Sequence, residues 1–97
     1  MWILQSAVDD DGDAMTFRMA PGTIKTVGRA PRADFVVDAA LVSRLHCRLT
    51  ATGEALDVVD LDSTNGTYIN DQRVKSGCIK RGDRLRVGRV EFRVDLA

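Results

Sequence analysis

Ser63-Thr64-Asn65-Gly66-Thr67-Tyr68 stands between two apolar runs of the chain. Asn65 and Gly66 both tolerate positive φ, so the pair alone predicts a tight turn between two strands. Further small side chains with hydrogen-bond donors surround the pair, at Ser63, Thr64 and Thr67, and a turn does not require so many. The stretch therefore predicts a strand-to-strand turn whose tip is suited to hold an anion or a peptide backbone.

Short alternating runs of apolar and polar residues extend outward from this stretch in both directions. Turn residues interrupt them about every eight to twelve positions, which is typical of antiparallel sandwiches and barrels, and no segment has the periodicity of a helix. About ten strands result, each too short to be stable alone, so we expect them to form two packed sheets. The expected strands are 2–8, 16–19, 24–27, 35–37, 47–52, 56–61, 68–69, 73–74, 84–87 and 90–94.

The composition indicates one globular domain over residues 1–97. The chain has 97 residues, no net charge, 44% hydrophobic residues and 29% charged residues. A chain of this length buries about two-thirds of its unfolded surface in a single core, which does not favour a deep cleft between domains.

Charge is distributed unevenly along the chain. Residues 1–15 carry four acids and no base, whereas residues 67–97 carry eight bases against four acids. The acidic run 9–13 superficially resembles a calcium loop but lacks the later oxygen ligands and the closing Glu, so we expect a solvated hairpin tip. The basic excess indicates that one end of the molecule prefers anions.

The two cysteines are too few for a disulfide framework, and the first residues lack the pattern of a signal peptide. No apolar run approaches the length of a membrane span. We therefore expect a cytoplasmic protein with reduced thiols and no membrane contact. His46 and Cys47 are adjacent, point to opposite faces of an extended chain and have no third ligand nearby in sequence, so we predict neither a metal site nor a cofactor.

Three predicted loop segments carry groups that suit a phosphate. They are Gly28-Arg29, Ser43-Arg44-Leu45-His46 and Thr64-Asn65. A phosphate monoester carries nearly two negative charges and three strong acceptor oxygens, so its site needs cationic donors together with hydroxyl or amide donors. Two arginines, a serine, a threonine and an asparagine meet that requirement.

In this order and spacing, the three segments resemble the forkhead-associated (FHA) domain, a phosphothreonine-binding module. The resemblance extends from the first strand to residues 82–88, which are similar to the closing hairpin of that family. It implies a β-sandwich of about eleven short strands in two twisted sheets, with recognition loops at one end and no catalytic activity. It also implies a phosphothreonine-containing partner in Ser/Thr-kinase signalling, and we expect the domain to be a monomer.

The resemblance assigns roles to five residues of the first two segments. Arg29 matches the arginine beside the phosphopeptide, and Gly28 matches the glycine that lets the strand end turn sharply. Ser43 corresponds to the serine whose hydroxyl and amide hold phosphate oxygens, and Arg44 adds positive charge. His46 is similar to the histidine that supports the loop from beneath, which is a structural role.

The third segment is assigned in the same way. Thr64 matches a second phosphate contact, and Asn65 matches the asparagine that binds the peptide main chain beside the phosphothreonine. Gly66 and Thr67 shape the loop. The family's preference for phosphothreonine implies a small pocket for the γ-methyl group, and burying one methyl contributes about 0.8 kcal/mol.

Leu41 and Val42 make the loop before Ser43 apolar. This favours an aliphatic residue over an acidic one three places after the phosphothreonine. Arg32 is the nearby charge that would instead favour an acidic residue there. The chain departs from the family at Asp71, where the small hairpin often has glycine. Members usually sit beside other domains, and the chain starts at Met1, so we expect the N-terminal module of a longer protein.

Two other functions remain open at this stage. One is polyanion or nucleic-acid binding through the basic C-terminal third, where alternation would spread the arginines over an outer sheet face without an aromatic stacking platform. Those arginines are Arg84, Arg86, Arg89 and Arg93, and the core residues between them are Leu85, Val87, Val90, Phe92 and Val94. The other is a scaffold of the same fold that binds its partner without phosphate.

A hydrolase is not favoured by the sequence. Ser43 and His46 are types found in nucleophilic catalysis, but the serine lacks a Gly-x-Ser-x-Gly elbow. The pair lies in a predicted loop and strand, where contact between the side chains does not follow from the spacing.

Overall fold

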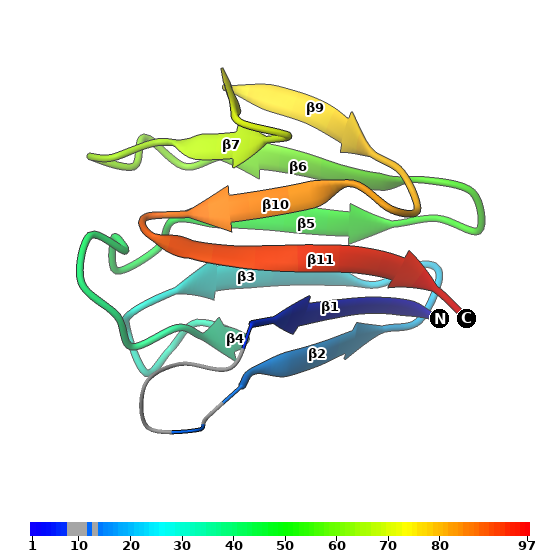
Figure 1. The fold of residues 1–97 in the computed structure, drawn as a ribbon, viewed down its shortest axis with the longest axis horizontal. Coiled ribbons are helices and arrows are strands. Elements are labelled where there is room, and N and C mark those ends of the chain that lie inside the picture. Colours follow the sequence, from blue (N-terminus) through cyan, green and yellow to red (C-terminus); the bar gives the residue numbers. More distant parts are fainter. Residues whose placement is uncertain (8–11, 13) are drawn as a thin grey trace.

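The alternating segments form two β-sheets stacked face to face, as Figure 1 shows for the computed structural model. The structure describes residues 1–7, 12 and 14–97, and within them it contains eleven strands and no helix. One sheet has six strands, in the order β2-β1-β11-β10-β7-β8, and the other has five, in the order β4-β3-β5-β6-β9. The predicted sandwich of short strands is therefore confirmed.

The strand bounds are close to those expected from the alternation. The strands of the six-stranded sheet are β1 (Trp2–Ser6), β2 (Thr16–Met19), β7 (Thr67–Ile69), β8 (Gln72–Val74), β10 (Arg84–Val87) and β11 (Val90–Leu96). Those of the five-stranded sheet are β3 (Ile24–Gly28), β4 (Phe35–Val36), β5 (Cys47–Ala51), β6 (Leu56–Asp60) and β9 (Ser76–Ile79).

Two features of the sheets differ from the sequence-based expectation. Strand β9 was not expected, because its small residues show no apolar alternation, and it forms by antiparallel pairing with β6. Strands β3 and β4 pair in parallel, with Val27 opposite Phe35, rather than antiparallel. The Asp34 carboxylate accepts hydrogen bonds from the Thr26 N–H and hydroxyl, which holds the short β4 beside β3.

The expected tip at residues 9–13 lies outside the described residues, apart from Gly12. Asn65-Gly66 is not a hairpin turn, because β6 and β7 belong to different sheets. The chain crosses between the sheets at this point, and the tight hairpin comes later at Asn70-Asp71, between paired residues Ile69 and Gln72.

Apolar side chains fill the space between the sheets, and the largest fully buried ones include Trp2, Phe92 and Leu49. The indole N–H of Trp2 donates to the Thr52 carbonyl at 2.8 Å, so its only polar atom is paired. Each fully buried side chain of this size contributes about 1.5–3 kcal/mol. Of the expected C-terminal core residues, all are buried except Val90, which is partly buried against the core.

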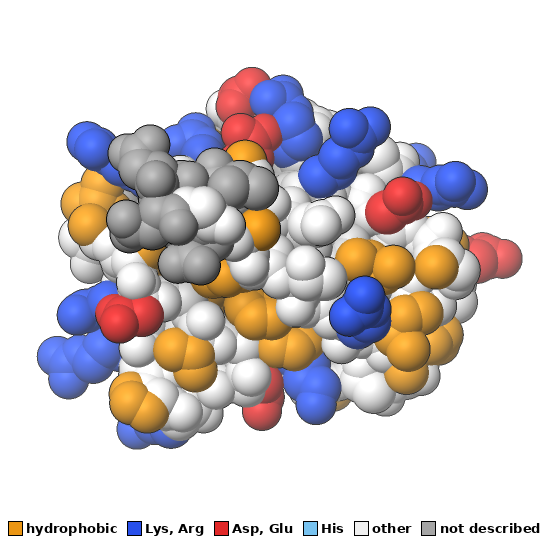
Figure 2. Space-filling model, turned by 60° about the horizontal axis from the view of Figure 1, so that its bottom comes forward, with side chains coloured by type: hydrophobic (Ala, Val, Ile, Leu, Met, Phe, Trp, Pro, Cys, Tyr) orange, Lys and Arg blue, Asp and Glu red, His pale blue; other side chains and the backbone are white. Residues whose placement is uncertain are grey.

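The two sheets approach each other closely at the edge strands β2 and β4. The Phe17 ring of β2 stacks on the Phe35 ring of β4, with centroids 4.5 Å apart. Figure 2, which brings this side forward, shows apolar side chains spread over it.

The two ends of the sandwich carry different parts of the chain. The termini meet at one end, where the Ala97 N–H donates to the Met1 carbonyl at 2.9 Å. The connections from β3 to β5, from β6 to β7 and from β10 to β11 gather at the other end (Figure 1). We call this second end the recognition end. Among the described residues, no helix is long and apolar enough to cross a membrane.

Candidate functional site

A surface hollow of about 780 Å³ opens at the recognition end. All five residues expected to bind a phosphopeptide line it, and they come from three separate loops: Arg29, Ser43, Arg44, Thr64 and Asn65. Folding thus brings together side chains that are far apart in the sequence. None of them makes an ion pair with a carboxylate in the part of the chain that the structure describes.

The loop containing Ser43 and Arg44 is fixed to the end of β3 by main-chain hydrogen bonds. The Arg29 N–H donates to the Ser43 carbonyl at 2.9 Å, and the Ala30 N–H donates to the Arg44 carbonyl at 3.0 Å. Gly28 allows this close approach, because a Cβ there would lie 2.0 Å from the Arg44 carbonyl oxygen. A side chain at Gly28 would therefore displace the loop.

His46 connects two loops from inside the molecule, the one between β4 and β5 and the one between β6 and β7. We call these two the recognition loops. The His46 side chain is fully buried, its Nδ1 accepts the Ser43 N–H at 3.1 Å, and its Nε2 lies 2.7 Å from the Gly66 carbonyl. Because Nδ1 accepts, the ring hydrogen must be on Nε2, where it donates to Gly66. His46 thus lies beneath the Ser43 loop and does not line the hollow.

The same contact changes the expectation for Ser43. Its N–H is already paired with His46, so of the two groups expected to hold phosphate, the hydroxyl is the one left. The Ser43 Oγ accepts the Thr64 N–H at 3.1 Å and keeps its own hydrogen for a ligand. This bond also sets the distance between the two loops.

Asp60 organises the loop between β6 and β7. Its carboxylate accepts hydrogen bonds from the N–H and hydroxyl of Ser63 and from the Thr67 hydroxyl, the last at 2.8 Å. Burial acts to raise the pKa of Asp60, but these hydrogen bonds outweigh it, so its pKa is lowered. The Ser63 Oγ in turn accepts the Gly66 N–H at 3.0 Å. The hydroxyls of Ser63 and Thr67 thus hold the loop itself.

Leu41 lies in the connection between β4 and β5, two residues before Ser43. It has a φ of 69°, and its carbonyl accepts the Asn65 side-chain N–H at 3.1 Å. A Cβ at Gly88, in the turn between β10 and β11, would lie 2.8 Å from the same carbonyl oxygen. The Leu41 side chain is 44% exposed at the hollow, so it is available to a ligand.

The other two residues of the expected specificity loop are placed differently. The Val42 side chain is buried in the core, so its carbonyl, which accepts the Arg29 Nε–H at 3.1 Å, is the part that serves the site. Arg32 is exposed but does not line the hollow. Asp38 and Asp62 do line it and were not predicted, although they precede Ser43 and Thr64 in the same two loops.

Beneath the site, Cys47 is buried and behaves as a small apolar residue. Burial, with the nearby Asp60 charge, raises the pKa of its thiol to about 12. A thiol that stays protonated is a poor nucleophile and a poor metal ligand. Within the described residues, no three His, Cys, Asp or Glu side chains gather as metal ligands.

These features define a β-sandwich with a preformed, arginine-bearing hollow at its loop end. Residues 25–88 match the family model of the FHA domain. The chain belongs to the FHA domain family, as its motifs predicted.

Proteins similar to this chain are found by comparing sequences and by comparing structures. The chain is 38% identical over 64 residues to the glycogen accumulation regulator GarA of Mycolicibacterium smegmatis, which is 66% of this chain and 40% of that protein. It is 33% identical to the FhaA FHA domain solved in complex with the intracellular domain of Rv3910, with a TM-score of 0.84 over 97% of this chain and 99% of that one. A structure from an analysis of phosphothreonine-dependent FHA domain interactions is 29% identical, with a TM-score of 0.80 over 100% of this chain and 98% of that one.

The curated relatives are longer than this chain. It spans 43% of an oxoglutarate dehydrogenase inhibitor of Corynebacterium jeikeium and 40% of GarA. These relatives are named as a regulator and an inhibitor.

Proposed function

We propose that this domain binds phosphothreonine-containing segments of a partner protein and catalyses no reaction. The observation that carries the proposal is the single hollow lined by Arg29, Ser43, Arg44, Thr64 and Asn65. Membership of the FHA family and the phosphothreonine-dependent interactions of a similar domain support it. The setting we propose is Ser/Thr-kinase signalling in the cytoplasm, with the domain as one module of a longer protein.

Charge-assisted hydrogen bonds to the phosphate supply most of the affinity in this proposal. The guanidinium groups of Arg29 and Arg44 face two negative charges, and the hydroxyls of Ser43 and Thr64 donate to the phosphate oxygens. Arg29 is anchored through its Nε–H to the Val42 carbonyl, which leaves its two NH₂ groups for the ligand. Because main-chain bonds already hold the loops, little ordering entropy is lost on binding.

Asn65 has the position to bind the peptide main chain. Its side-chain N–H is tied to the Leu41 carbonyl, which orients the amide and leaves its oxygen to accept a peptide N–H. Few anchors and little apolar burial indicate micromolar binding, about −8 kcal/mol at a Kd near 1 μM. The partner segment would lie extended across the loops, with the γ-methyl of the phosphothreonine in a small pocket.

The rim of the hollow also bears on which peptides fit. The exposed Leu41 side chain offers apolar contact, whereas Asp38 and Asp62 repel acidic residues. We propose that an aliphatic residue is favoured three places after the phosphothreonine and that an acidic residue is disfavoured. Selection from a degenerate phosphopeptide library tests this preference, and enrichment of Asp at that place would contradict it.

The function itself is tested by titration with one phosphothreonine peptide and its phosphoserine and unphosphorylated forms, at two salt concentrations. Arg44→Ala is the test variant, and Arg48→Ala is its matched control, because Arg48 is an exposed arginine of β5 that does not line the hollow. We expect binding that requires phosphothreonine, is weakened by Arg44→Ala and is kept by Arg48→Ala.

Two other results would replace the proposal. Tight binding to nucleic acid with a steep salt dependence, and no preference among the peptides, would establish polyanion binding. Absence of binding to every peptide and to nucleic acid would indicate a scaffold that recognises its partner without phosphate.

A further inference from the structure

The outer face of the six-stranded sheet is rich in arginine. Cross-strand pairing places five arginines on this face, from β2, β8, β10 and β11: Arg18, Arg73, Arg84, Arg86 and Arg93. On the five-stranded sheet, the outward residues of the paired strands β3, β5, β6 and β9 include one base, Arg48, and one acid, Asp57. Two acids, Glu91 and Asp95, share the six-stranded face, so five bases lie with two acids on that face against one base and one acid on the other.

Three of these arginines form a compact group that we call the arginine face, namely Arg84, Arg86 and Arg93. Arg84 lies directly opposite Arg93 across the pair β10–β11. Like charges directly opposite each other destabilise a sheet. Carboxylates of the chain itself offset this repulsion at Arg84 but not at Arg93 among the described residues.

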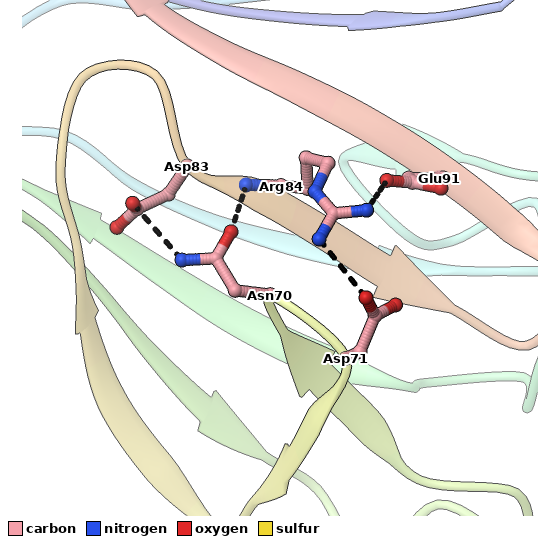
Figure 3. Close-up of polar contacts among 5 residues, drawn as sticks. All are labelled: Asn70, Asp71, Asp83, Arg84 and Glu91. Carbon is pink, nitrogen blue, oxygen red and sulfur yellow. Dashed lines mark hydrogen bonds and ion pairs between the residues drawn. The ribbon is translucent and has the colours of Figure 1, made fainter.

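Arg84 shows how this face holds carboxylates. Its guanidinium donates to Asp71 at 2.9 Å and to Glu91 at 3.1 Å, as Figure 3 shows. Arg86 lies over the Tyr68 ring, 4.0 Å from its centroid. Arg93 has no carboxylate partner in the part of the chain that the structure describes. Of the three, Arg93 is thus the one left to an external anion.

A second hollow, of about 550 Å³, opens beside Arg93. Arg84, Arg93 and Glu91 line it together with Gln5 and the end of β1. We propose that the arginine face is a second docking surface, which binds an acidic segment of a partner protein with a carboxylate at Arg93. This surface is distinct from the recognition hollow, and the proposal does not depend on phosphothreonine binding.

An acidic protein segment fits this face better than a nucleic acid does. Glu91 and Asp71 lie among the arginines and would repel a continuous phosphate backbone, whereas separate carboxylates can bind between them. The ring of Tyr68 is covered by Arg86, so it offers no platform for stacked bases. The turn between β10 and β11 contacts Leu41 at the recognition end, so one partner can engage both surfaces.

The test is binding of the whole chain to a short unphosphorylated peptide that alternates Glu and Ser, measured by fluorescence anisotropy. Its counterpart alternates Gln and Ser. We expect Arg93→Glu to weaken binding of the glutamate peptide by about tenfold or more, which corresponds to about 1.4 kcal/mol. Arg48→Glu makes the same charge change on the opposite sheet and should change binding little, and Arg44→Ala should leave it intact.

Four results would overturn the proposal. They are equal weakening by Arg93→Glu and Arg48→Glu, loss of binding in Arg44→Ala, equal binding of the glutamine peptide, and stronger competition by an oligothymidine than by the glutamate peptide. Arg93→Gln removes the charge without reversing it, and it should weaken binding in the same direction if Arg93→Glu disturbs the fold. Thermal melts of each variant establish that the chain remains folded.

Discussion

Two asparagine-led segments of the chain have similar sequences and different structural roles. Asn65-Gly66 lies in the crossing between the sheets and is held from inside by the buried His46 and Ser63, the latter bonded to the partly buried Asp60. Asn70-Asp71 forms a hairpin turn in which both residues have positive φ, 49° and 68°, as a type I′ turn requires. Exposed side chains tie this second turn to the start of β10 (Figure 3).

The two segments differ in whether the groups that hydrogen-bond to them are buried or exposed. A segment held by buried groups keeps one geometry when its ligand is absent, because breaking those bonds leaves unsatisfied polar atoms in the core. A segment held by exposed groups can exchange them for water at little cost. The comparison predicts that substitutions beneath the recognition loops have large effects on stability and binding, and that substitutions around the hairpin turn have small ones.

His46→Ala is expected to have the largest effect. It removes two hydrogen bonds and leaves a cavity at a fully buried site, which should lower the free energy of unfolding by about 3 kcal/mol. Phosphopeptide binding should fall too, because both recognition loops lose their common support. Urea denaturation measures the first effect and titration the second. A melt that matches the wild type would show that His46 is not a structural brace.

Substitutions at the surface of the hollow should show that peptide binding can be weakened with little change in stability. Arg29→Ala, Ser43→Ala and Asn65→Ala are each expected to weaken phosphothreonine peptide binding by about 1.5–3 kcal/mol, as hydrogen bonds to or around a charged group do. Asn65→Ala should change unfolding little, since its bond to Leu41 is exposed. Asn70→Ala is the matched change in the hairpin turn, and it should leave binding intact. Equal binding losses in the two asparagine variants would contradict the separation.

The acid dependence of stability should report on the loop between β6 and β7. The pKa of Asp60 is lowered in the folded state, so its contribution is present above its unfolded pKa and is lost as pH falls through the folded value. Thr67→Val removes one of the bonds that lower this pKa. We expect the variant to be less stable by about 1.5 kcal/mol near neutral pH and the gap to shrink in acid.

Asp34 also has a lowered pKa, because of hydrogen bonds from Thr26, so total stability alone does not identify Asp60. The difference between wild type and Thr67→Val does, since the Asp34 contribution is common to both. A gap that stays constant from neutral to acid pH would place the effect of Thr67 in packing rather than in its bond to Asp60.

Much of the fold could be predicted from alternation alone. Strand β2 begins and ends where the pattern predicts, and Leu85 and Phe92 are buried as expected. The pattern gave no sign of β9, because Ser76, Gly77 and Cys78 pair with β6 through main-chain atoms, which leave no pattern in the sequence.

The site depended on the family resemblance, because its hollow is assembled from loops that no local pattern relates. The sequence also did not predict which of two neighbouring side chains is buried and which is exposed. Leu41 and Val42 are both apolar, yet one is exposed and the other is buried. The positive φ of Leu41 turns the chain at this point, and nothing in a leucine predicts it. Arg89, which was grouped with the arginines of the outer face, lies in the turn after β10, as the expected strand bounds 84–87 and 90–94 imply.

Asp71→Gly is expected to have the smallest effect and gives the sharpest test of the comparison. It would give the Asn-Gly pair that type I′ turns favour and relieve the positive φ of Asp71. Against this, it removes an exposed ion pair with Arg84, worth about 0–1 kcal/mol, and adds about 0.4–1 kcal/mol of unfolded-chain entropy. The net change should be within about 0.5 kcal/mol of zero.

The opposite substitution in the recognition loop should behave differently. Gly66 has a φ of 89°, so Gly66→Ala should destabilise by about 1–2 kcal/mol from backbone strain alone. A Cβ there would also lie 2.7 Å from Arg73 Nε, which must move. Thermal melts of Asp71→Gly and Gly66→Ala under the same conditions compare the two losses of stability. If Asp71→Gly destabilises as much as Gly66→Ala, the hairpin turn is held as firmly as the recognition loop, and burial of the partners is not what distinguishes them.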